Sequence, residues 1–200
     1  MPKVIPEYKE AAKTKIIEAA KEVFAKKGYH ETTMVDIAKE IGVSKGALYS
    51  YFKSKEDLLK EISLLNHQTL RDIIDTACKS HDLTQALEEV YSKLTGKYGG
   101  NLHTNFEIVA LASHDPKTKE IIMNDYKRDL EAVQVFLEDK MKQGTMRTDA
   151  NARTLAELFT SLYIGTMAKL ILGFDSKEMH DNWIESMLLI LSKTKPNKPR

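Results

Sequence analysis

Cysteine, proline and glycine are all scarce in this chain of 200 residues. Its one cysteine, Cys78, cannot form a disulfide within the chain. Five prolines and nine glycines leave most of the sequence free of helix breakers, and four of the prolines lie close to a terminus. The composition therefore excludes a disulfide-stabilised scaffold and a fibrous chain, and it favours helices.

Long apolar runs and a large charge of one sign are also missing. The most apolar stretch, 162–174, contains Thr166 and Lys169 and is shorter than the roughly 20 residues of a membrane helix. The first residues include no run resembling a secretory signal, so we expect a cytoplasmic protein with no membrane partner. The net charge of +1 is too small for a protein that coats DNA without sequence preference.

Apolar residues recur at spacings of three and four, and no segment alternates as a strand would, which predicts an all-α fold. Short helices are expected within residues 12–51, followed by a long helix over 54–78. Further helices are expected at 82–98, 102–113, 116–143, 150–172 and 177–193. We expect an N-terminal three-helix domain at 1–53, a larger helical domain at 54–194 and a flexible tail at 195–200.

Residues 33–52 have the pattern of a helix-turn-helix. Thr33 can cap a short helix, Gly42 can end it, and Ser44 can cap a second helix. Two helices this short need a shared core, which we expect to contain Phe24, Ile37, Ala38, Ile41, Val43, Leu48 and Phe52. The opposite face of the second helix presents Lys45, Gly46, Tyr49 and Ser50, the set that a DNA major groove would meet.

Gly46 is unexpected, because glycine in the first turn of a helix costs about 1 kcal/mol relative to alanine. Two explanations are open. The backbone at Gly46 could approach a DNA phosphate closely, or it could pack tightly against a neighbouring helix. Lys45, Tyr49 and Lys55 are placed for phosphate contacts, which provide affinity without much sequence information. Residues 1–60 contain 12 Lys and 9 Asp and Glu, an excess that is compatible with a DNA-binding face there.

Residues 12–60 contain a long composite pattern, which consists of Phe24, Gly28, Thr33, Ile37, Ala38, Gly42, Val43, Ser44, Leu48, Tyr49, Tyr51 and Phe52. This pattern resembles the DNA-binding domain of the TetR-type transcriptional repressors. The resemblance implies that Thr33 and Lys55 touch phosphate, that Tyr51 touches the DNA backbone, and that other side chains approach bases. The complete implied DNA-binding set is Thr33, Met34, Val35, Ser44, Lys45, Gly46, Ala47, Tyr49, Ser50, Tyr51 and Lys55. Ser50 stands where the family often has a large aromatic residue or His, which reduces the expected base readout.

Dimerisation is expected because a helix-turn-helix usually binds a palindromic double-stranded operator as a homodimer. The last two expected helices carry more apolar surface than one core should need, and the resemblance implies that they form a four-helix dimer bundle. The expected interface comprises Leu158, Leu162, Gly165, Trp183, Ile184, Met187, Leu188 and Leu191. The alternative is that these residues belong to the core of a single chain.

An aromatic and methionine-rich set on several expected helices could line a pocket for a small, largely apolar effector, such as a fatty acyl chain, an aromatic compound or a lipophilic drug. With two polar candidates, His103 and Glu107, the set comprises Tyr91, Leu94, Tyr98, Phe106, Val109, Met123, Tyr126, Leu130, Phe159, Tyr163 and Met167. The alternative is ordinary core packing.

His103, Glu107 and His114 could share one helix face, but no second cluster of metal ligands accompanies them, so we expect no metal and no cofactor. No nucleotide-binding loop or hydrolase motif is present, which indicates that the chain is not an enzyme. The sequence thus predicts an effector-responsive DNA-binding regulator that acts as a repressor. The alternatives are a helical interaction module and an architectural DNA binder without an effector.

Overall fold

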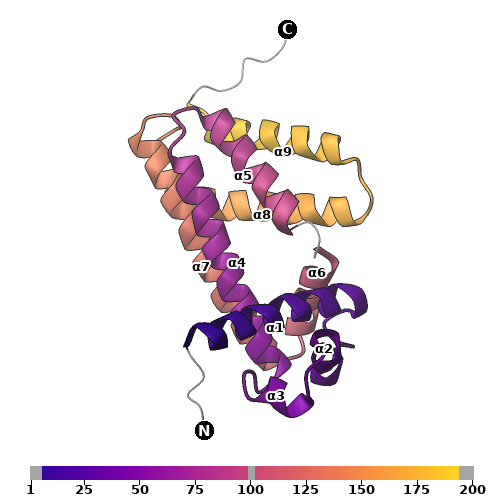
Figure 1. Ribbon diagram of the computed structural model, residues 1–200. Coiled ribbons are helices and arrows are strands. Elements are labelled where there is room, and N and C mark those ends of the chain that lie inside the picture. The colour runs from indigo at the N-terminus through magenta and orange to yellow at the C-terminus, as the bar shows by residue number, and fades with distance from the viewer. Residues whose placement is uncertain (1–5, 99–101, 194–200) are drawn as a thin grey trace. The chain divides into compact units, whose positions relative to one another are not determined.

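The computed structural model describes residues 6–98 and 102–193, and every regular element within them is a helix (Figure 1). The all-α prediction is confirmed. In chain order the helices are α1 (Pro6–Lys27), α2 (Met34–Ile41), α3 (Lys45–Tyr49), α4 (Lys55–Cys78), α5 (Leu83–Tyr98), α6 (Leu102–Ala112), α7 (Pro116–Lys142), α8 (Ala152–Ile171) and α9 (Ser176–Leu191). No helix in the described part of the chain is long and apolar enough to cross a membrane.

Short polar side chains set the first residues of the later helices. Pro116 begins α7 as expected, and the Asp115 carboxylate accepts a hydrogen bond from the backbone N–H of Thr118 at 2.7 Å. Asn151 caps α8, so this helix begins at Ala152 rather than at the expected residue 150. Asp175 caps α9 in the same way, so this helix begins at Ser176, one residue earlier than expected.

The contacts divide the chain into two compact units. Unit 1 comprises the residues up to Asn66 together with His103–Asp125, and unit 2 comprises His67–Leu102 together with the residues from Tyr126 on. This division differs from the expected boundary at 53/54, because most of α6 and the first turns of α7 pack with the N-terminal helices. The expected tail at 195–200 lies outside the described residues.

The core of unit 1 joins α1, α2, α3, α4 and α6. Ile37, Leu48 and Leu58 are completely buried in it, and Ile108 brings α6 into the same cluster. These residues come from four helices, two of which have only eight and five residues. Their shared burial supplies the stabilisation that such short helices lack in isolation.

The core of unit 2 is rich in aromatic rings. Trp183 of α9 is 2% exposed and lies with its ring 5.2 Å from that of Tyr91 and 5.3 Å from that of Phe159. Helices α8 and α9 run side by side (Figure 1). His180 of α9 lies with its Nε2 atom 2.6 Å from a carboxylate oxygen of Glu88 of α5.

A buried lysine closes the C-terminal end of α4. The Lys140 side chain is 0% exposed, and its Nζ atom donates to the carbonyl oxygens of Cys78 (3.1 Å) and Ser80 and to the side-chain oxygen of Gln143 (3.0 Å). Burial lowers the pKa of this ammonium group. The last carbonyls of a helix are left without intrahelical partners, and Lys140 satisfies that of Cys78, the last residue of α4, and that of Ser80 just beyond it, near the negative end of the helix dipole.

Replacing this ammonium tests its role in stability. We expect Lys140→Met to lower the free energy of unfolding by about 1–3 kcal/mol, because the part-buried Ser80 carbonyl would lose this donor and the Cys78 carbonyl would keep only that of Gln143. Denaturant unfolding followed by circular dichroism measures the change, with the exposed Lys142→Met on the same helix as control. Equal stability of the two variants would contradict the capping role.

Candidate functional site

Thr33 caps α2, as the sequence predicts, and together with Asp36 it forms a capping box. The Thr33 hydroxyl accepts a hydrogen bond from the N–H of Asp36 at 3.2 Å, and the Asp36 carboxylate accepts one from the N–H of Thr33 at 2.9 Å. Lys27 also donates to Asp36, at 2.7 Å. The bonds from Lys27 and Thr33 hold the pKa of Asp36 far below its usual range. The first turn of α2 is therefore tied to the end of α1.

The turn between α2 and α3 depends on Gly42, whose φ of +75° lies in the left-handed region. Its N–H donates to the carbonyl of Lys39, and the following N–H of Val43 donates to that of Ala38, so two of the last four carbonyls of α2 are satisfied. Ser44 then caps α3 by accepting from the N–H of Ala47 at 3.1 Å. The predicted helix-turn-helix is present, with both predicted caps.

The outer face of α3 is solvent-exposed and polar. Lys45, Gly46, Ala47, Tyr49 and Ser50 are all exposed, whereas Leu48 between them is buried. The Lys45 ammonium lies 5.6 Å from the centre of the Tyr49 ring, and the Ser50 hydroxyl donates to the carbonyl of Ala47 at 2.6 Å. This face offers one cation, one phenol and one hydroxyl to a partner.

Gly46 is not explained by packing, because a Cβ atom built there would meet no atom within 4 Å. Of the two explanations that the sequence leaves open, tight packing within the chain is excluded. A close approach to an external partner is the explanation that remains.

Two side chains in this region lie elsewhere than expected. Met34 is 7% exposed and belongs to the core of unit 1, so it is not available to a base, whereas its neighbour Val35 is exposed. Val43 is 40% exposed rather than in the core, because the turn after Gly42 directs it outward. Tyr51 is half-buried against the core.

Lys55 and Glu107 have partners that the sequence did not indicate. The Lys55 ammonium donates to the carbonyl oxygens of Tyr29 (2.7 Å) and His30 (3.0 Å), and burial lowers its pKa. The Glu107 carboxylate accepts from the N–H groups of the same two residues. The expected phosphate anchor and the expected ligand anchor thus both hold the loop between α1 and α2.

The expected effector-binding residues are divided between the two units. His103, Phe106, Glu107, Val109 and Met123 belong to unit 1, and the others belong to unit 2. In unit 2 the side chains of Tyr91, Leu94, Leu130, Phe159 and Met167 are buried, with Tyr163 half-buried beside them and Tyr126 exposed. The buried members pack as core, which is the alternative left open above. Tyr98 lies outside the residues whose side chains are described.

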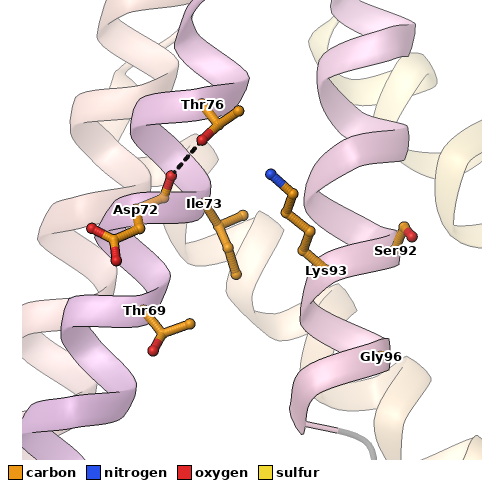
Figure 2. Close-up of a pocket in the computed structure, with 7 residues that line it drawn as sticks. All are labelled: Thr69, Asp72, Ile73, Thr76, Ser92, Lys93 and Gly96. Carbon is orange, nitrogen blue, oxygen red and sulfur yellow. Dashed lines mark hydrogen bonds between the residues drawn. The ribbon is translucent and has the colours of Figure 1, made fainter.

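A groove of about 370 Å³ lies between α4 and α5 in unit 2 (Figure 2). It is lined by Thr69, Asp72, Ile73, Thr76, Ser92, Lys93 and Gly96. Ile73 and Lys93 point into the space between the helices, whereas the Asp72 carboxylate and the Ser92 hydroxyl lie on the outer sides (Figure 2). The Lys93 ammonium pairs with Glu89 at 2.7 Å. Sequence reasoning missed this groove because none of its residues is aromatic or a methionine.

Comparison with known proteins places residues 16–62, which span the helix-turn-helix, in the tetR family of bacterial regulatory proteins. The chain is a TetR-family transcriptional regulator. Over 157 residues it is 28% identical to the HTH-type transcriptional regulator UidR of Escherichia coli, covering 78% of this chain and 80% of UidR.

Solved structures agree on the fold of this TetR-family regulator. GusR of Salmonella enterica superposes with a TM-score of 0.77 at 22% identity, covering 95% of this chain and 99% of GusR. A protein of Saccharomonospora viridis, crystallised in complex with choline, gives a TM-score of 0.77 at 21% identity, covering 92% and 100% of the two chains. The relatives are DNA-binding regulators rather than enzymes, as the sequence predicts.

Half of the expected dimer interface of the TetR-family regulator is internal. Trp183, Ile184, Met187 and Leu191 are buried in the core of unit 2. Leu158 and Gly165 are exposed, and Leu162 and Leu188 are half-buried. The apolar residues that the sequence analysis assigned to the dimer interface therefore lie partly in the chain's own core and partly on its surface.

The histidine and glutamate set on α6 is not assembled as a metal site. Glu107 is engaged by the α1–α2 loop, His103 is exposed, and His114 follows the last residue of α6. Among the described residues no group of three or more His, Cys, Asp or Glu side chains could hold a metal ion.

Gly46→Ala separates stability from DNA binding. Alanine favours the helix, so the free energy of unfolding should rise by about 0.5–1 kcal/mol. DNA affinity should fall about tenfold, equivalent to 1.4 kcal/mol, because the added methyl group keeps the backbone of α3 away from DNA. Thermal unfolding and fluorescence anisotropy with labelled duplex measure the two effects. A more stable variant with unchanged affinity would show that the glycine serves no close approach.

Proposed function

We propose that this TetR-family regulator is a repressor that binds a palindromic operator as a homodimer and is released by a small-molecule effector. The observation that carries the proposal is the exposed polar face of α3, whose opposite face is buried in the core of unit 1 through Leu48. The exposed residues of this five-residue helix and its cap, which include Lys45, Tyr49 and Ser50, have no role within the chain's own core. It fits a major groove, which admits one α-helix.

The proposed DNA contacts follow the exposure of the side chains. Lys45 and Tyr49 would bind phosphate or a base edge, and Ser50 would accept from or donate to several bases. Thr33 and Val35 at the start of α2 complete the set, with Ser44, Gly46, Ala47 and the half-buried Tyr51. Met34 is left out because it is buried, and Lys55 is left out because its ammonium already serves two carbonyls.

The proposed dimer uses the exposed part of α8 and α9. Leu158, Leu162 and Gly165 recur at spacings of three and four along α8, so they share one face of that helix. Leu189 of α9 is 58% exposed, and a Cβ atom at Gly165 would meet nothing within 4 Å of its own chain. A second copy packing there would cover these apolar groups and leave the glycine for close helix contact.

The proposed link between effector and DNA is α4, which carries residues of both sites. Leu58 and Leu59 near its start pack in the core of the helix-turn-helix, and Thr69, Ile73 and Thr76 near its end line the groove. An effector that prefers another position of α4 would separate the two helix-turn-helix elements of a dimer. A coupling of about 1–3 kcal/mol gives a 5- to 150-fold change in DNA affinity, and DNA weakens effector binding by the same factor.

The proposed effector is a small organic anion with an apolar body, such as a fatty acid. Lys93, whose ammonium pairs with Glu89 at 2.7 Å, would exchange this partner for the carboxylate of the effector, and Ile73 would provide the apolar contact. This refines the expectation of a largely apolar effector, because two of the aromatic residues that suggested it, Tyr91 and Phe159, pack as core. The Saccharomonospora viridis protein binds choline, a cation, so it supports only the view that this fold accommodates a small molecule.

Selection of duplexes from a random DNA pool tests operator binding. At about 150 mM salt, which suppresses non-specific phosphate attraction, we expect a palindrome whose half-sites lie about 34 Å apart, one helical turn. Purified full-length chain and sequencing of the bound fraction suffice. Equal enrichment of all sequences would favour an architectural binder, and no retained DNA would favour a helical interaction module.

Octanoate and octanol test the effector class. At about 100 times its Kd, octanoate should stabilise the chain by about 2.7 kcal/mol and should release the selected duplex. The neutral alcohol should do neither at the same concentration, and Lys93→Met should abolish the octanoate effect. The exposed Lys127→Met is the matched control. An equal response to both compounds, or an unaffected Lys93→Met, would contradict an anion site at Lys93.

A further inference from the structure

The loop between α1 and α2 is held from two sides by charged side chains of two other helices. Glu107 of α6 accepts hydrogen bonds from the backbone N–H groups of Tyr29 at 2.9 Å and His30 at 2.7 Å. Lys55 of α4 donates to the carbonyl oxygens of the same two residues. One carboxylate and one ammonium therefore engage both N–H groups and both carbonyls of a dipeptide, and charge-assisted bonds of this kind are the stronger ones.

The loop is shaped to receive the carboxylate. Gly28 has a φ of +82°, and a Cβ atom there would lie 2.8 Å from Oε2 of Glu107, closer than any side chain allows. The Tyr29 side chain is buried beneath the Lys55 ammonium, which lies 4.7 Å from its ring centre. Thr32 closes the loop by donating to the carbonyl of Gly28 at 2.6 Å.

This loop leads directly into the helix-turn-helix, because Thr33, which caps α2, follows it. Helix α6 makes two further attachments to the same region. Thr104 donates to the carbonyl of Phe24 near the end of α1 at 3.3 Å, and Ile108 is buried in the core of unit 1. Helix α6 lies outside the matched segment 16–62, yet most of it belongs to the compact unit that contains α2 and α3.

We propose that Glu107 is a positioning residue for DNA recognition. Its carboxylate fixes the direction in which α2 leaves α1, and through the shared core of α2 and α3 it sets the orientation of the exposed face of α3. The inference rests on the DNA-binding function proposed above. Glu107 is negatively charged, so phosphate would repel it and it is not itself a DNA contact. If replacing Glu107 lowers the affinity for DNA, the cause is therefore a change in the loop between α1 and α2.

Glu107→Gln in the full-length chain is the decisive variant. Glutamine preserves the size of the side chain, but its amide offers one acceptor and sets an NH₂ group against the second backbone N–H. Glu120→Gln, on an exposed position of α7 in the same unit, makes the same change in net charge. Ile17→Val removes one buried methylene from α1 and controls for a general loss of stability in unit 1.

Two measurements are compared across these variants. Amide hydrogen exchange reports whether the N–H groups of Tyr29 and His30 are still protected, and fluorescence anisotropy gives the Kd for the duplex selected with the wild-type chain. We expect Glu107→Gln to accelerate exchange of both amides and to raise the Kd about tenfold beyond any change in Ile17→Val. Glu120→Gln should change neither, and Glu107→Asp, which preserves the charge, should regain part of the affinity.

Several results would overturn the inference. Unchanged exchange at Tyr29 and His30 would show that Glu107 does not hold the loop. Faster exchange with a Kd no higher than that of Ile17→Val would show that the contact serves folding alone. If Glu107→Gln does not fold, amide exchange and the Kd of Glu107→Asp are compared with those of Ile17→Val instead. A wild-type chain that binds no duplex defeats the proposed function and this inference together, whereas wild-type binding with an unaffected variant defeats this inference alone.

Discussion

The burial of α2 and α3 in one shared core is the constraint on which the DNA-binding part of this molecule depends. Helices of eight and five residues are far below the length that is stable alone in water. They persist because Ile37 and Leu48 are completely buried against α1, α4 and α6. Any element that contributes to this core also fixes where the exposed face of α3 points, so stability and recognition are coupled in the same set of contacts.

Features that depend on neighbouring residues could be predicted from the sequence. Thr33 and Ser44 each accept a bond from an N–H three residues later, and Gly42 ends a helix through its own backbone conformation. The helical periodicity, the helix-turn-helix and the buried faces of α1 to α4 follow from the same local rules. The polar face of α3 was predictable because it lies opposite Leu48.

Features that depend on distant partners could not be predicted in this way. Glu107 bonds to residues 77 and 78 positions earlier, and nothing in its own segment distinguishes it from a ligand anchor. Lys55 has the position of a phosphate anchor in the family pattern, but the loop carbonyls that engage its ammonium lie 25 and 26 residues away. Trp183 has the same periodicity whether it packs within its own chain or on a second copy. Periodicity indicates that a face is buried, and tertiary structure decides by what.

The way the chain uses its charges also bears on how it recognises DNA. Lys140 satisfies the carbonyls after α4, Lys55 those of the α1–α2 loop, and Glu107 the amides of that loop. Three ionised side chains thus serve backbone groups at helix connections and are lost to any partner. With a net charge of only +1, the chain has little long-range attraction for phosphate. In the proposed complex, affinity would therefore depend on local contacts and on the fit of α3, which the charged contacts at these connections would hold in place.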